Sequence, residues 1–246
     1  MVGLLFGGPG MEHPISCLSA VTVFSQLDRQ RYRVLAMGWH RQGGFHVSEN
    51  IQDLIDKPGD PKHGGVRRHG PIRELSDLGL NAIFPIVHGT AGEDGVLQGY
   101  LDLLGIPYAG SGVLGSSLCM HKGLSKAILK EAGIPVTDWV TFRQGDRLPT
   151  TLPFQGQPCF VKPASSGSSV GVTKVLRVEE LPKALETAFR ECPEVLVEPA
   201  INARELECAV LDGEASGIGE IICHHDFYSY EAKYVDPKVA DTLTHP

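Results

Sequence analysis

The sequence lacks several features that would point to particular classes of protein. It has no excess of positive charge, since the 246 residues carry a formal net charge of −7 and the pI is about 5.8. Nucleic acids and anionic membranes attract basic faces, so neither is expected as a partner. No apolar run approaches the roughly 20 residues that span a bilayer. The start, MVGLLFGGPG, has no charged segment of a signal peptide, and we expect a cytoplasmic protein.

Paired cysteine and histidine motifs are also missing. The six cysteines are scattered, mostly in apolar runs, and no two form a CxxC pair. This distribution predicts reduced thiols in the core and argues against a disulfide framework. His224 and His225 are adjacent but lack the i, i+4 spacing of a helical metal site, so we expect them to be solvated.

Apolar runs and glycine turns alternate with helical patterns in the first half of the chain. The run VGLLFGG (2–8) predicts a buried parallel strand and a tight turn, and helical spacing follows over 15–27. Further elements are predicted in the same order: strands over 32–40, 82–89 and 106–110, a hairpin continuation over 43–49, and a helix over 94–104. Alternation of this kind predicts an open α/β sheet.

The second half predicts a smaller mixed unit. Helical spacing over 113–132 ends at Gly133 and Pro135, which are stop signals for a helix. The later elements are predicted as an amphipathic helix over 178–191 and strands over 136–142, 159–163, 172–176, 194–200, 205–211 and 217–225. The remaining residues form a polar tail, in which we expect no closing element.

Polar residues gather in two loops that follow predicted strands. FGGPGMEHPIS places Glu12 at a helix start, and VHGTAGEDG places His88, Glu93 and Asp94 at another. In open α/β sheets such loops form the ligand crevice. The GxGxxG spacing of a dinucleotide site is absent. A plain strand-to-helix turn, with Glu12 favourable at a helix N-terminus, remains the alternative.

A lysine ends the predicted strand CFVKP. Lys162 would lose hydration there at a cost in free energy, unless an anion meets it. The next residues, SSGSSVG (165–171), supply backbone N–H groups and flexibility that suit a cover over phosphates, although a plain hairpin turn is the alternative. Two further lysines are candidates, Lys122 within an apolar helical pattern and Lys233 in the tail.

Two glutamates stand at or after the end of another predicted strand. Glu198 ends EVLVEP, and Glu205 follows seven residues later. Carboxylates in such places can accept hydrogen bonds from an adenine amino group and from ribose hydroxyls. A solvated strand end is the alternative for both.

Five motifs follow one another in the order and spacing of a known enzyme family. They are FGGPGMEHPIS, FPIVHGTAGEDGVLQGYLDLLGIPYAGSGVLGSSLCMHK, FVKPASSGSSVGV, VLVEPAINARELECAVL and FYSYEAKY. From its first strand to about residue 235 the sequence resembles the D-alanine–D-alanine ligases, ATP-grasp enzymes of bacterial peptidoglycan synthesis. The resemblance implies an α/β ATP-grasp fold of three parts. These are an N-terminal open parallel-sheet domain (1–120), a small α+β lid (121–197) and an incomplete third domain (198–246).

The resemblance implies a nucleotide site formed by several of these residues. Lys122 and Lys162 would bind the phosphates of ATP beneath the loop that carries Ser168, and Lys233 would reach the γ-phosphate. Glu198 would meet the adenine and Glu205 the ribose.

The resemblance also implies a site for D-alanine. Glu12 matches the glutamate that holds the ammonium group of the first D-alanine, and His88 lies in a loop that lines the same site. Ser168 and Tyr234 match a serine and a tyrosine that form a hydrogen-bonded network with that glutamate. The implied enzyme is a homodimer when full length.

The implied reaction has two steps. The carboxylate of the first D-alanine attacks the γ-phosphorus of ATP and becomes an acyl phosphate, and the amine of the second D-alanine then displaces the phosphate. A D-alanine–D-lactate ligase is the alternative within the family, but FYSYEAKY resembles the dipeptide-forming members. A non-catalytic nucleotide-binding remnant is the alternative outside the enzymes.

The sequence departs from the family pattern at single positions and at its end. Gly10, Pro14 and His121 replace a serine, an acidic residue and an aspartate. Family members run on further, and the ligands for Mg²⁺ (or Mn²⁺) belong to that part. We therefore expect a truncated ligase that has no metal ligand of its own, leaves a sheet edge open and is inactive alone. Asp236 and Asp241 are expected to be solvated.

Overall fold

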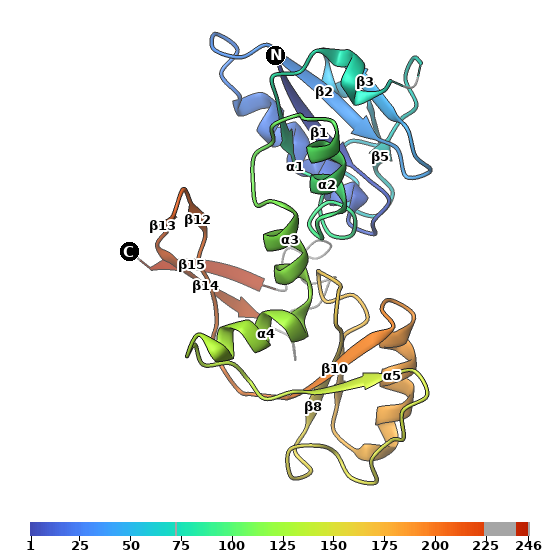
Figure 1. Ribbon diagram of the computed structural model, residues 1–246, viewed down its shortest axis with the longest axis vertical. Helices are drawn as coiled ribbons and strands as arrows, with labels where there is room; N and C mark the ends of the chain where they lie inside the picture. The colour runs from blue at the N-terminus through green and yellow to red at the C-terminus, as the bar shows by residue number, and fades with distance from the viewer. Residues whose placement is uncertain (72, 224–239, 246) are drawn as a thin grey trace. The chain divides into compact units, whose positions relative to one another are not determined.

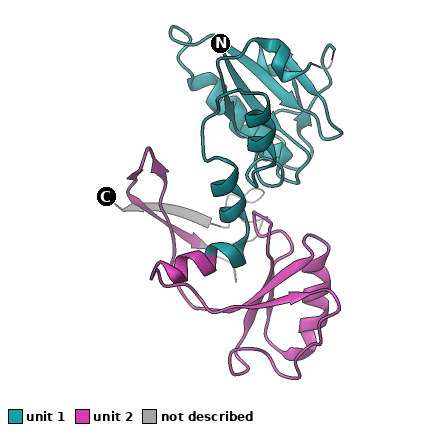
Figure 2. Ribbon diagram, viewed as in Figure 1, with its two compact units in different colours: residues 1–125 teal, residues 126–246 magenta. Residues whose placement is uncertain are grey.

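The structure, a computed structural model, describes residues 1–71 and 73–223 and the backbone of 240–245. The chain forms two compact units, residues 1–125 and 126–246, which Figure 2 distinguishes by colour. Each unit is described by itself below. The division into three domains at residues 120 and 197 stays a prediction.

A four-stranded sheet forms the centre of the first unit, in the order β3-β2-β1-β6 (Figure 1). Strand β1 (Val2–Gly7) runs parallel to β2 (Val34–Trp39) and β6 (Ala82–Pro85), and β3 (Phe45–Ser48) pairs antiparallel with β2. The parallel strands read as continuous apolar runs because both faces of such a sheet are covered. The predicted parallel strands and the hairpin are therefore confirmed.

Each face of this sheet has its own hydrophobic core. Leu4 and Phe6 of β1 pack in one core with Cys17 and Ala20 of helix α1 (His13–Gln26). Leu5 packs in the other core with residues of helix α2 (Val96–Leu103). The division follows from the twofold side-chain alternation of a strand. The smaller elements of the unit are η1 (Ile51–Asp53), β4 (Ile55–Asp56), β5 (Gly65–Val66) and η2 (Leu75–Leu78).

Two expectations for residues 106–132 are wrong in detail. The single helix predicted over 113–132 is two helices, α3 (Val113–Met120) and α4 (Lys122–Glu131). The break falls at His121, whose φ of −89° and ψ of 97° are extended. The apolar spacing continues across this one extended residue, so the hydrophobic periodicity of the sequence does not reveal the break between the helices. The strand predicted over 106–110 is reduced to one bridge between Ile83 and Tyr108.

The second unit contains a four-stranded antiparallel sheet in the order β7-β10-β8-β9. Helix α5 (Leu181–Phe189) packs four buried side chains against it, and Pro182 lies in the first turn, where no N–H is needed. The strands of this sheet are β7 (Val140–Arg143), β8 (Cys159–Pro163), β9 (Thr173–Val175) and β10 (Glu194–Pro199). Short turn η3 (Val178–Glu180) precedes the helix.

A second sheet of this unit corrects the expectations for the end of the chain. Strand β14 (Ile218–Cys223) pairs antiparallel with β11 (Glu205–Glu207) on one side and with β15 (Ala240–His245) on the other. The edge of β14 is therefore not open, and the tail contains a closing strand. The polar composition of ADTLTH hid it, although threonines favour extended backbone. The strand predicted over 205–211 is divided into β11 and β12 (Val210–Leu211), which pairs with β13 (Glu214–Ala215).

The described cysteine side chains make no disulfide. Cys17, Cys159 and Cys192 are buried, whereas Cys119 and Cys208 are exposed. The expected core position holds for the three buried cysteines and is wrong for the two exposed ones. Within the described part of the chain, no helix combines the length and apolar character that crossing a membrane requires.

The core of the second unit should depend on Leu185 of α5, which is 2% exposed. We expect Leu185→Ala to lower the free energy of unfolding by about 2 to 5 kcal/mol, because it removes buried methyl groups and leaves a cavity. Urea unfolding of the intact chain measures the change. Leu176→Ala is the matched control, since Leu176 is 57% exposed. Equal losses in both variants would contradict the assigned core.

Candidate active site

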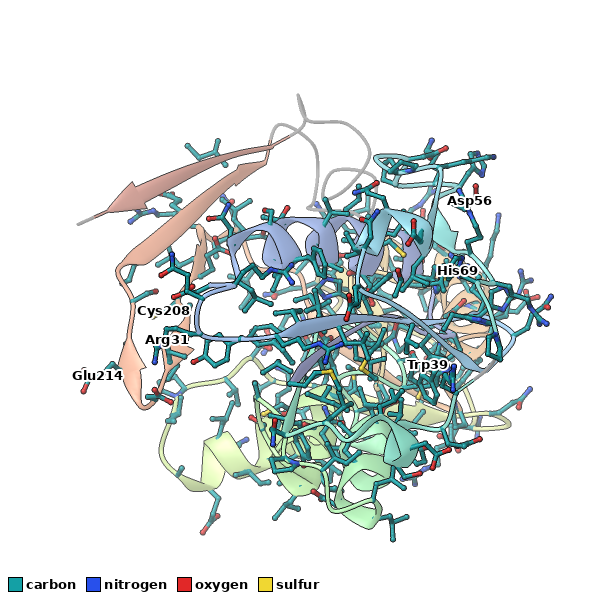
Figure 3. All side chains as sticks on the ribbon, turned by 90° about the horizontal axis from the view of Figure 1, so that it is seen from above. Arg31, Trp39, Asp56, His69, Cys208 and Glu214 are labelled. Carbon is teal, nitrogen blue, oxygen red and sulfur yellow. The ribbon has the colours of Figure 1, made fainter. Side chains whose placement is uncertain are left out.

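The turn between β1 and α1 is built on two glycines and one serine. Gly7 and Gly8 have φ values of 93° and 89°, a left-handed conformation that residues with a Cβ rarely adopt. The Gly8 N–H donates to the carbonyl of Trp39 at 2.8 Å (Trp39 is labelled in Figure 3). The Gly7 N–H donates to Ser16 Oγ at 2.8 Å, and Ser16 donates to the carbonyl of Ile86 at 2.6 Å. These bonds join the ends of β1 and β2, helix α1 and the segment after β6.

His13 holds the same turn from within. Its Nδ1 lies 2.5 Å from the carbonyl of Gly8, and its Nε2 lies 2.8 Å from the N–H of Val66. A backbone N–H can only donate, so Nε2 accepts and the proton is on Nδ1. Burial is the main cause that lowers the pKa of His13 to about 4, which keeps the ring neutral near pH 7. The sequence analysis missed this role because Val66 lies far along the chain.

Glu12 lies against the second candidate loop. Its side chain is buried, and a Cβ placed on Gly89 would overlap the Glu12 carboxylate. Gly89 also has a φ of 68°, so two constraints favour glycine there. The Glu12 side chain does not cap α1, although the residue stands at its N-terminus. The structure thus brings together the two strand-end loops that the sequence singled out.

His88 connects the second loop to helix α1. Its Nε2 lies 3.0 Å from the hydroxyl of Ser19, and its Nδ1 lies 3.7 Å from Glu93 Oε1. The interaction with His88 is the main cause that lowers the pKa of Glu93. Ser19 is a second residue that the sequence analysis missed. Asp94 has a structural role, because it accepts the N–H groups of Ala91 and Val96 at 2.8 and 3.1 Å.

In the second unit, two lysines share one carboxylate. Lys162 Nζ of β8 lies 2.8 Å from Glu198 Oε2 of β10, and Lys126 Nζ of α4 lies 3.3 Å from Glu198 Oε1. The side chain of Glu198 is 8% exposed, that of Lys126 14% and that of Lys162 27%. The structure therefore pairs Lys162 with Glu198, and it adds Lys126, which the sequence analysis missed. One carboxylate between two ammonium groups leaves a surplus positive charge.

The serine- and glycine-rich segment after β8 contains unusual backbone. Ser168 and Ser169 have φ values of 48° and 59°, and such left-handed serines cost about 1 to 2 kcal/mol each. Gly171, at φ 72°, has no room for a Cβ, which would lie 2.8 Å from Pro163 Cγ. Strain of this kind clusters at ligand clamps and switch segments. The segment is thus more than a relaxed hairpin turn.

The structure says less about the remaining candidate site residues. Lys122 begins α4, and Glu205 begins β11 with an exposed side chain. Lys233 and Tyr234 lie outside the described residues. Among the residues that the structure does describe, no three His, Cys, Asp or Glu side chains gather in a way that fits a metal ion.

Comparison with known proteins identifies the family. The D-ala D-ala ligase N-terminus family matches residues 1–111, and the D-ala D-ala ligase C-terminus family matches 128–245. The chain is 41% identical to D-alanine–D-alanine ligase A of Chromobacterium violaceum, over 96% of this chain and 70% of that protein. The chain belongs to the D-alanine–D-alanine ligase family. Another member, D-alanine–D-alanine ligase A of Escherichia coli K12, is 39% identical over 96% of this chain and 71% of its own.

Solved structures of the family have the same fold. The D-alanine–D-alanine ligase of Coxiella burnetii matches with a TM-score of 0.74 and 34% identity, over 90% of this chain and 70% of that one. The Bacillus anthracis ligase complexed with ATP matches with a TM-score of 0.71 and 27% identity, over 100% and 70%. The VanG D-Ala:D-Ser ligase of Enterococcus faecalis matches with a TM-score of 0.74 and 29% identity, over 99% and 75%. The predicted ATP-grasp fold is confirmed.

The neutral state of His13 predicts how the stability of this ligase depends on pH. The pKa of His13 is about 4 in the folded chain and about 6.5 in the unfolded chain. Between these values only the unfolded state binds the proton, so acid favours unfolding. The stabilisation of the fold by neutral His13 is complete above about pH 6.5 and is lost as the pH falls to about 4. We expect a loss on the order of 3 kcal/mol over this window.

Denaturant unfolding between pH 4 and 7 tests the His13 assignment. The His13→Gln variant cannot titrate and should show a shallower dependence of unfolding free energy on pH. His63→Gln, at an exposed histidine of the same unit, should keep the slope of the natural chain. The assignment is wrong if the two variants have the same slope.

Proposed function

We propose that the protein joins two D-alanine molecules to D-alanyl-D-alanine at the expense of ATP, through a D-alanyl phosphate, for peptidoglycan synthesis. The observation that carries the proposal is the cluster of Lys162, Glu198 and Lys126, which offers a nucleotide both surplus positive charge and a fixed carboxylate. Family membership indicates which substrates the protein uses, because the curated relatives are named for D-alanine ligation.

The nucleotide half of the site draws on the second unit. Lys162 would bind the phosphates of ATP, and Glu198 would accept a hydrogen bond from the adenine amino group. The strained turn with Ser168 would lie over the phosphates, where exclusion of water protects an acyl phosphate from hydrolysis. Binding of phosphates by Lys122 and Lys233, and of ribose by Glu205, is supported by the motif matches alone.

The amino acid half draws on the first unit. Glu12 would hold the ammonium group of the first D-alanine, and the loop with His88 would line this site. The glycine turn and the neutral ring of His13 support this role, because they fix the backbone from which Glu12 extends. Ser168 and Tyr234 would complete a hydrogen-bonded network with Glu12, as their motifs suggest.

The residues of the chain would promote both steps by position and charge. Held by Glu12, the first D-alanine would present its carboxylate to the γ-phosphorus. Lysine ammonium groups would stabilise the negative charge that develops on the transferred phosphoryl group. Mg²⁺, which the family uses, neutralises phosphate charge when bound, and we assign it no ligand among the described residues. A homodimer is part of the proposal and is suggested by the resemblance.

The test is an assay of the protein expressed from its own gene, with ATP, Mg²⁺ and D-alanine. We expect phosphate and D-alanyl-D-alanine in equal amounts. Adding D-lactate beside D-alanine should give little D-alanyl-D-lactate, because the expected nucleophile is the amine of D-alanine and D-lactate offers only a hydroxyl. ATP binding without any ligation would favour a non-catalytic protein, and preferential use of D-lactate would favour the other ligase.

Lys162 should contribute to ATP affinity. We expect Lys162→Met to raise the Kd for ATP roughly 10- to 100-fold, since a hydrogen bond to a charged group contributes about 1.5 to 3 kcal/mol. Calorimetric titration measures the change. Lys174→Met is the matched control, because Lys162 and Lys174 lie over the same Phe160 ring, 5.5 and 6.0 Å from its centre, and Lys174 is on the adjacent strand. Unchanged affinity in Lys162→Met would refute the nucleotide site.

A further inference from the structure

The cluster at Glu198 has more positive charge than one carboxylate needs. Each of the two carboxylate oxygens has its own ammonium group, Lys162 Nζ at 2.8 Å from Oε2 and Lys126 Nζ at 3.3 Å from Oε1. Glu198 lies on β10 and is buried, so its charge has to be balanced by protein groups rather than by water. Either lysine alone would give a neutral pair. The presence of a second lysine beside this one carboxylate therefore needs a separate explanation.

The two lysines are held very differently. Lys126 Nζ also donates to the carbonyl of Thr137 at 2.9 Å and to the Thr137 hydroxyl, and it lies 5.6 Å from the ring centre of Trp139. These contacts fix it in place independently of Glu198. Lys162 also lies near a ring, 5.5 Å from the ring centre of Phe160, but it is about twice as exposed, and among the described residues Glu198 is its hydrogen-bond partner. Lys162 is the penultimate residue of β8, and the strained Ser168 follows six residues later.

The energetics of a buried ion pair show what the second lysine changes. Removing one partner of such a pair is strongly destabilising, because the other charge stays buried and unpaired. If Lys162 were the sole counter-ion, moving it to a phosphate would impose this penalty on Glu198 and weaken nucleotide binding. With Lys126 in place, Glu198 keeps a paired ammonium group throughout. Lys162 can then exchange one anion for another at little cost.

We propose that Lys126 is the permanent counter-ion of Glu198 and that it frees Lys162 to leave this carboxylate for the phosphates of an arriving nucleotide. Lys126 is then a positioning residue that touches neither the phosphates nor the reacting atoms. It also keeps the Glu198 carboxylate oriented as a hydrogen-bond acceptor after Lys162 has left. This inference rests on the proposed function, because it takes ATP as the incoming anion.

The first measurement is the Kd for ATP of the full protein and of four variants at Lys126 and Lys130. Lys126→Met and Lys126→Gln both remove the charge, and Lys126→Gln keeps a donor for Thr137. We expect each to raise the Kd at least tenfold, while Lys126→Arg restores most of the affinity. Lys130→Met is the matched control, since Lys130 is on the same helix and lies 5.8 Å from the Trp139 ring centre. It should bind ATP like the natural protein.

A second substitution separates the counter-ion role from a merely structural one. In Lys126→Met, Lys162 is held by Glu198, so replacing that glutamate by glutamine should release it. The double variant Lys126→Met/Glu198→Gln should therefore bind ATP several-fold more tightly than Lys126→Met alone. If Lys126 only stabilised the fold, a second change in the cluster would not restore affinity, and thermal unfolding midpoints of all variants would follow the loss of binding.

The outcomes distinguish this inference from the proposed function. If the natural protein binds no ATP, the proposed nucleotide site is wrong. If the natural protein binds ATP and both Lys126→Met and Lys126→Gln bind it equally well, the counter-ion role is overturned and the nucleotide site stands. The role is also overturned if the double variant binds no more tightly than Lys126→Met. Where Lys126→Met does not fold, the pair Lys126→Gln and Lys126→Gln/Glu198→Gln decides by the same criterion.

Discussion

A carboxylate that is removed from water has to meet positive charge, and Glu198 meets it from two directions. Lys162 extends from the neighbouring strand β8 and Lys126 from helix α4, so one side chain joins two strands and a helix. The attraction between such charges is strong only where water is excluded, which is the case around this carboxylate. Because two ammonium groups face one carboxylate, a surplus charge remains for an anion. The proposed ATP site follows from this balance.

The first unit uses neutral groups to hold its part of the proposed site. His13 and Ser16 both form hydrogen bonds with the turn after β1, and neither brings a charge into the interior. The turn that carries Glu12 is therefore held without an added positive charge, which suits the ammonium group that we propose as the ligand of Glu12. The contrast with the charged cluster at Glu198 suits the two different ligands that we propose.

Much of the fold could be predicted because local pattern and tertiary environment agree. Strands β1, β8 and β10 are apolar runs bounded by glycine, proline or charge, and they were predicted nearly to their ends. The predictions failed where a single residue or a single pairing strand determines the local structure. His121 interrupts a helix without changing the apolar spacing, and strand β15 has a polar sequence that becomes a strand because β14 offers it hydrogen bonds.

The sequence by itself determined the family and the candidate residues. Five motifs in fixed order pointed to the ligases, and strand-end positions pointed to Glu12, Lys162 and Glu198. Only the tertiary structure decided the partners of these residues. Val66 meets His13 across 53 positions and Ser19 meets His88 across 69. Lys126 meets Glu198 between elements that lie far apart in sequence. Such contacts carry no local signal, because hydrogen bonds and ion pairs depend on distance in space, and folding alone sets that distance.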